Sequence, residues 1–451
     1  MCPDRVISMQ YFIMWEETKV QRAVGHVRAV VGRILFIGVS VQILLGLLWM
    51  FLSFDDRQEF FGSAYAEWLD RNLAGIHYEP AIYLLQLCVA FFAGYWLLEG
   101  LGARKKFWKI WGSFAILTYP YAMQCHMAIL PDSLAFSCFL LLLAAGLKRR
   151  KIIYFFWLIS AMFLPEYLYF GAVPVLVFLF VSARKKGNLR ELGMEIMIIM
   201  SVAVIGLGFR TISSVEGEGL EEAWFRRTVW SSFYQFYPDW PAEVRAAITA
   251  DEYVAIERLP ENMELILRPK VKAILGEKGA GQWYREFSAF VFRANREQIL
   301  KEMIKDAGGC LSPQIMAEIR LGGKGGPSYC LRNYEIMRED HPLLTSCFLG
   351  YSAWWHVVGM LGVFIMVVGR LCSNRTNRVK ATVAEKECWR CVLTAGVLSA
   401  TLMIGYYTLW ASNLWDPKKA LFVGILWSLW MIRETGLVIG FFSEKSGEMY
   451  Q

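Results

Sequence analysis

Uncharged apolar runs long enough to cross a lipid bilayer restrict the fold of this chain more than any other feature. One run extends from Ile34 to Phe54 and another from Cys391 to Trp415, and neither contains a charged residue. A helix of about 20 residues crosses the hydrocarbon core of a bilayer. Only 19% of the 451 residues are charged and 56% are hydrophobic, whereas soluble domains are about one quarter charged. The sequence therefore predicts an all-α, multi-pass membrane protein.

Basic residues cluster beside the apolar runs, at 104–106, 148–151 and 184–186. Such clusters mark the cytoplasmic side of a membrane protein, so the net charge of +7 indicates membrane orientation and not nucleic-acid binding. With every cluster on one side, the pattern predicts about ten crossings of the plasma membrane and places both termini in the cytoplasm. The crossings are expected at 34–54, 80–98, 108–123, 127–147, 192–209, 346–369, 391–414 and 420–432, and as two short helices within 152–182 that meet near Pro165.

Four regions follow from this pattern. Residues 1–33 form an amphipathic segment on the cytoplasmic face, and residues 34–209 form a membrane module with an outer loop at 55–79. Residues 210–345 are the one large polar segment and form an extracytoplasmic lobe between spans seven and eight. Residues 346–451 supply the C-terminal membrane helices.

Acidic residues recur where apolar runs meet the outer surface. Asp55 and Asp56 follow the first span, Asp132 lies at the mouth of the fourth, and Glu166 lies between the two short helices. Ionisable groups near membrane depth are costly and tend to face a cavity. Such a carboxylate can act as a general base or hold a divalent cation, for which Asp56 and Asp132 are the candidate ligands. Each acid alone has the alternative of a solvated charge at a helix end, and His126 could join them or simply cap its turn.

Basic residues on the predicted outer side are candidates for binding a lipid-linked phosphate. Lys418 and Lys419 precede a short apolar helix, and Arg226 and Arg227 lie early in the polar lobe. The lysines could instead extend from a helix end to the membrane surface, as long cationic side chains often do. The sequence leaves both interpretations open.

The layout resembles the GT-C superfamily of membrane glycosyltransferases. The corresponding stretches are Ser53-Phe54-Asp55-Asp56-Arg57, residues 210–345, and the hairpin that ends in Ile129-Leu130-Pro131-Asp132-Ser133. The resemblance covers most of the chain as topology but very little as exact motif, and no invariant string identifies a subfamily.

This resemblance implies an inverting transfer of a sugar from a polyprenyl-phosphate donor to an acceptor on the outer face. Asp55 or Asp56 would deprotonate the acceptor hydroxyl, and the outer cations would stabilise the leaving phosphate. Aromatic side chains of the lobe would stack on sugars or, alternatively, form its core: Trp224, Trp230, Tyr234, Tyr237 and Trp240.

Two other classes of protein fit the same sequence. A transporter or lipid flippase would contain paired broken helices in two halves, and the short helices near Pro165 have no counterpart in the second half. A non-enzymatic membrane protein could use the lobe of residues 210–345 to bind a partner.

Overall fold

A computed structural model of the chain consists of α-helices and their connections, and it contains no strand among the residues it describes. The all-α prediction is confirmed for this part of the chain. The described residues are 3–52, 71, 79–103, 105–119, 122–123, 126, 131–148, 151–163, 167–186, 197–202, 204, 224–225, 228, 239–240, 242–246, 268–309, 340–373, 383–410, 428–433 and 435–436.

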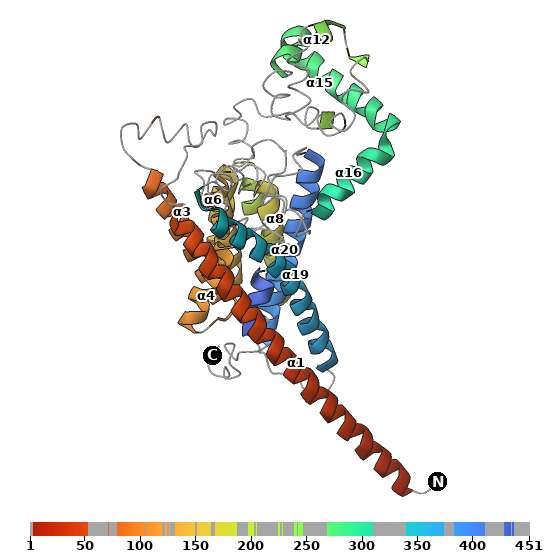
Figure 1. The fold of residues 1–451 in the computed structure, drawn as a ribbon. Helices are drawn as coiled ribbons and strands as arrows, with labels where there is room; N and C mark the ends of the chain where they lie inside the picture. The colour runs from red at the N-terminus through yellow and green to blue at the C-terminus, as the bar shows by residue number, and fades with distance from the viewer. Residues whose placement is uncertain are drawn as a thin grey trace.

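The first helix, α1 (Pro3–Leu52), is 50 residues long and extends beyond the rest of the bundle towards the N-terminus (Figure 1). At a rise of 1.5 Å per residue its length is about 75 Å, more than twice the thickness of a hydrocarbon core. It joins the expected interfacial segment 1–33 to the first span. No proline follows Pro3 before Pro80, so none breaks the helix before its end at Leu52.

Two described helices are long and apolar enough to cross a membrane. They are Gly25–Leu52 within α1 and Ala81–Gly100 within α3 (Glu79–Gly100). Length and composition alone identify them, so they support membrane association but do not establish ten crossings. Shorter apolar helices are Asp132–Leu147, Ile153–Phe163, Tyr167–Val181 and Trp389–Gly405.

The helices of the expected third and fourth spans are shorter than the sequence predicts. α4 (Lys106–Leu117) ends before Thr118, and α6 (Pro131–Leu147) begins later than position 127. Pro120 disfavours a helical conformation in the residue before it, which ends α4 early. Pro131 occupies the first position of α6, where its missing N–H costs no hydrogen bond.

The helix break predicted near Pro165 separates α7 (Ile153–Phe163) from α8 (Tyr167–Lys186). Residues 164–166 themselves lie outside the described residues. The indole N–H of Trp157 in α7 donates to the carbonyl oxygen of Leu168 at 3.0 Å, which ties the two helices together near the break. α8 is not short, because it continues for 20 residues and includes Pro174.

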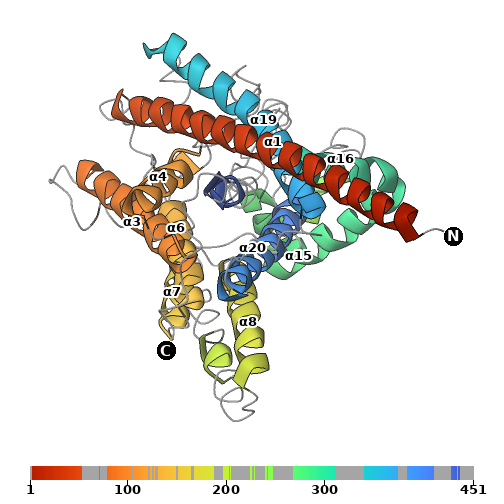
Figure 2. The same ribbon diagram turned by 90° about the horizontal axis from the view of Figure 1, so that it is seen from below.

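The C-terminal helices pack against the N-terminal ones. α19 (Pro342–Ser373) lies beside α1, and α20 (Val383–Trp410) lies beside α8 (Figure 2). The hydroxyl of Ser399 in α20 donates to the carbonyl oxygen of Phe170 in α8 at 3.1 Å. Residues distant in sequence therefore form one bundle.

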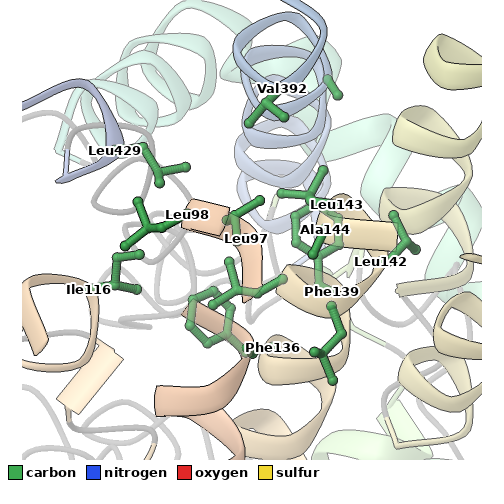
Figure 3. Close-up of a cluster of buried hydrophobic side chains, with 14 of the residues drawn as sticks. Leu97, Leu98, Ile116, Phe136, Phe139, Leu142, Leu143, Ala144, Val392 and Leu429 are labelled. Carbon is green, nitrogen blue, oxygen red and sulfur yellow. The ribbon is translucent and has the colours of Figure 1, made fainter. Parts of the chain in front are cut away.

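The main core is built from side chains that α3, α4, α6 and α20 turn toward one another (Figure 3). Trp108 and Trp111 of α4 stack with ring centroids 4.6 Å apart, and Trp111 donates to the hydroxyl of Ser40 in α1 at 3.0 Å. The core residues labelled in Figure 3 are Leu97, Leu98, Ile116, Phe136, Phe139, Leu142, Leu143, Ala144, Val392 and Leu429.

The polar lobe contains α12 (Ala242–Ala246), α15 (Arg268–Ala294) and α16 (Arg296–Gly309), and Figure 1 shows it at the end of the bundle opposite the N-terminus. It has a hydrophobic core of its own, in which Phe225 contacts the rings of Trp240 and Trp283. Trp240 is a buried core residue, which favours the core interpretation of this aromatic over a sugar platform. Trp230, Tyr234 and Tyr237 lie outside the described residues.

Candidate functional site

Only two of the predicted site residues, His126 and Asp132, belong to the described part of the chain. The others lie outside it, and their roles stay predictions: Asp55, Asp56, Glu166, Arg226, Arg227, Lys418 and Lys419. The helix ends that adjoin these residues in sequence are described, and they define the candidate site.

Asp132 lies in the first turn of α6 and is only 5% exposed. The N–H groups at the start of a helix carry a partial positive charge, which favours a carboxylate at this position. Proline at the preceding position starts the helix without disturbing these N–H groups. The local sequence Pro131-Asp132-Ser133 thus explains both the start of α6 and the burial of an acid there.

His126 and Ser133 form a buried pair next to Asp132. The Nδ1 atom of His126 lies 2.7 Å from the hydroxyl oxygen of Ser133, and both side chains are almost fully buried. The imidazole ring also packs against Phe136, with centroids 5.8 Å apart. Burial lowers the pKa of His126 to about 3 from its ordinary 6.5, so the imidazole is neutral at pH 7. A neutral imidazole has one donor and one acceptor nitrogen, and the hydrogen bond to Ser133 holds the ring in place.

This geometry fits both interpretations of His126 in part. Through its hydrogen bond to Ser133 the residue is tied to the start of α6, as a polar cap is, and Ser133 directly follows Asp132 in the chain. Ser133 was not predicted as a site residue. The pattern His-x6-Ser at a helix start is too common to indicate a pair.

The end of α1 packs against the same connection. A hydrophobic cluster joins Trp49 and Met50 of α1 to Met123, three residues before His126, and to Phe348 of α19. The Trp49 ring stacks on Phe348 with centroids 6.1 Å apart, and its indole N–H donates to the hydroxyl of Thr345 at 3.4 Å. The C-terminal end of α1, the α4–α6 connection and the start of α19 therefore meet at one end of the bundle, called here the Leu52 end.

A buried polar side chain of α1, Gln42, bonds to the residue that follows α4. Gln42, which is 5% exposed, donates from Nε2 to the carbonyl oxygen of Thr118 at 3.4 Å. A buried amide in an apolar helix is costly unless it is hydrogen-bonded. Gln42 was also missed by the sequence analysis, although it is a polar residue inside the uncharged run 34–54.

Metal binding finds no further support among the described residues, which contain no group of three or more His, Cys, Asp or Glu side chains able to hold an ion. Of the two candidate ligands for a divalent cation, Asp132 is described and Asp56 is not. One carboxylate supplies too few oxygen ligands for a magnesium or calcium site.

Comparison of the chain with protein families, with curated proteins and with solved structures finds no match. The resemblance to the GT-C superfamily thus stays a prediction that rests on topology and on the positions of the acids.

Proposed function

We propose that this chain is an integral-membrane glycosyltransferase with its active centre at the Leu52 end of the bundle. The single observation that carries the proposal is the packing of Trp49 and Met50 against Met123 and Phe348. In sequence, Asp55 and Asp56 follow Leu52 within four residues, and His126 and Asp132 follow Met123 within nine. The described contacts thus join the end of α1 to Met123, and the His126–Ser133 hydrogen bond links the segment after Met123 to the start of α6.

The proposed reaction is an inverting displacement at the anomeric carbon of a sugar linked to polyprenyl phosphate. The acceptor oxygen forms a bond to this carbon while the bond from the carbon to the phosphate oxygen breaks. The acceptor proton passes to the carboxylate of Asp55 or Asp56, and polyprenyl phosphate leaves with its electron pair. A general base of this kind accelerates a reaction by about 10²–10⁴-fold.

Cationic side chains stabilise the leaving phosphate in this proposal. Lys418 and Lys419 are the first candidates, and Arg226 and Arg227 are the second. A divalent cation would add positive charge at the same phosphate, with Asp56 and Asp132 as ligands. The neutral His126 takes no charge in this scheme and keeps the start of α6 in position.

The membrane arrangement of the proposal has about ten crossings of the plasma membrane and cytoplasmic termini. The lobe that contains α15 and α16 would lie outside the cytoplasm. Two observations support this orientation. The lobe lies beyond the Leu52 end (Figure 1). In the sequence, basic residues follow α3 and α6 and begin α4, at the other end of these helices.

The decisive experiment measures glycosyl transfer by the purified protein in vesicles. Asp55→Asn and Asp56→Asn are compared with the wild type on a panel of polyprenyl-phosphate sugars, and released polyprenyl phosphate is quantified. We expect the rate of glycosyl transfer to fall by at least 100-fold in one of the two variants, while Asp70→Asn from the same loop retains activity. Full activity in both variants at unchanged unfolding free energy would show that the acid pair is not catalytic.

The same vesicles test the transporter alternative. A transporter or flippase moves the labelled lipid across the sealed bilayer and releases no polyprenyl phosphate. That result would replace the transferase proposal, as would binding of a protein partner by the lobe without any turnover.

A further inference from the structure

A group of lysines gathers at the end of the bundle opposite the Leu52 end. The carboxylate of Glu99 at the end of α3 forms a salt bridge of 3.2 Å with Lys148 after α6. Close packing of Gly100 against Leu147 brings the same two helix ends together. The α3–α4 turn and the α6–α7 turn therefore form one surface, called here the lysine surface: Glu99, Lys105, Lys106, Lys109, Lys148 and Lys151.

Positive charge dominates the lysine surface, which has five ammonium groups and one carboxylate among its described residues. Lys105, Lys106 and Lys151 are exposed, and Lys109 and Lys148 are partly buried. Like charges on one surface repel one another, and a bound anion would relieve this repulsion.

Aromatic rings of α3 hold two of these lysines. The ammonium of Lys109 lies 4.7 Å from the ring centroid of Tyr95, and that of Lys148 lies 5.3 Å from the centroid of Trp96. A cation–π contact orients an ammonium group without neutralising its charge. Tyrosine and tryptophan are also the residues that favour the headgroup level of a bilayer.

Exposed apolar side chains accompany the lysines. Phe107 is 54% exposed, Ile152 is 42% exposed and Ile110 is 37% exposed, and each lies within three positions of a lysine of this surface. Cationic groups beside exposed apolar ones match the two parts of a phospholipid, an anionic headgroup and its acyl chains. A soluble phosphate would satisfy the lysines but would leave Phe107 and Ile152 in water.

We infer that the lysine surface binds anionic phospholipid headgroups from the leaflet that surrounds this end of the bundle. The lysines contact the headgroup phosphate, and Phe107, Ile110 and Ile152 contact the acyl chains. This inference requires that the bundle lies in a membrane, but it does not require the proposed transfer reaction. Its test uses lipid binding alone, so that either conclusion can fail without the other.

The test is lipid retention by the full-length protein in detergent, measured by native mass spectrometry with phosphatidylglycerol or phosphatidylcholine added. The triple variant K105Q/K106Q/K151Q removes the exposed lysines and leaves Lys109 and Lys148 on their aromatic partners. The control K278Q/R285Q/K301Q removes the same charge from exposed positions of the lobe.

We expect the wild type and the control to retain phosphatidylglycerol in preference to phosphatidylcholine. The affinity of phosphatidylglycerol for the triple variant should be about 100-fold lower than for the wild type, because each basic residue contributes to the free energy of binding at an anionic surface. Equal retention of the two lipids by the wild type, or an equal loss in the control, would overturn the inference. Displacement of phosphatidylglycerol by millimolar glycerol phosphate would assign the surface to a soluble anion and overturn it as well.

Discussion

The hydroxyl of Tyr351 in α19 donates a hydrogen bond of 2.8 Å to the backbone carbonyl oxygen of Gly38 in α1. One turn further along α19, the ring of Trp355 stacks on Tyr351, with centroids 6.2 Å apart, and packs directly onto Gly38. A methyl group added at Gly38 would lie 2.1 Å from this indole. Gly38 thus permits the close approach of two helices that are more than 300 residues apart in sequence.

Gly38→Ala should destabilise the bundle by about 1–3 kcal/mol, because the indole of Trp355 fills the space that the new methyl group needs. The free energy of unfolding by sodium dodecyl sulfate in mixed micelles measures this effect. Gly25→Ala is the matched control, since a methyl group at Gly25 of the same helix meets nothing within 4 Å. The control should be neutral or more stable by up to about 1 kcal/mol. Equal effects of the two substitutions would contradict the close contact.

Tyr351→Phe should cost about 0.5–1.5 kcal/mol in the same assay, because it removes one hydroxyl donor and leaves the ring stacked on Trp355. The effect is small since the Gly38 carbonyl oxygen belongs to a helix and retains its backbone acceptor role. In the Gly38→Ala background the cost should disappear, because the methyl group forces α19 away. An additive double variant would show that the hydrogen bond and the close packing are independent.

Much of the bundle follows from the sequence. Uncharged runs predict the helices, and proline or basic residues predict where those helices end. Pro165 between two basic clusters predicts the break between α7 and α8. The continuity of α1 does not follow, because a polar segment and an apolar one can share a helix or turn at their junction. The Gly38–Trp355 contact could not be predicted from the sequence either, since glycine has no side chain whose pattern could indicate a partner.

The candidate site was less predictable than the fold. The position of Asp132 near the start of an apolar run made it a candidate site residue. Its burial agrees with the expectation of an acid near membrane depth. The His126–Ser133 hydrogen bond does not follow, because it depends on the path of the chain between α4 and α6. Sequence patterns identify helix periodicity, whereas a contact across a turn depends on backbone geometry that composition does not determine.

Gly276→Ala in the lobe should cost about 1–2 kcal/mol although no atom opposes the added methyl group. The backbone of Gly276 has φ of 67°, a left-handed conformation that makes a kink inside α15 and that only glycine adopts without strain. Gly281→Ala, five residues later in the same helix, also meets nothing within 4 Å and lacks the positive φ. Limited proteolysis of the intact protein should therefore show faster cleavage near α15 for Gly276→Ala only. Equal cleavage of both variants would argue against the kink.

The buried histidine between α4 and α6 predicts a loss of stability at mildly acidic pH. The pKa of His126 is about 3 in the folded protein and 6.5 when exposed, so the unfolded chain binds one more proton between these values. The contribution of His126 to the unfolding free energy is therefore complete above pH 6.5 and decreases as the pH falls towards 3. Between pH 7 and pH 5 the unfolding free energy should drop by about 2 kcal/mol from this residue alone. His126→Gln should remove that part of the pH dependence, whereas Ser133→Ala should lower stability at pH 7 but keep the slope. An unchanged slope in His126→Gln would show that the imidazole is not buried in its neutral form.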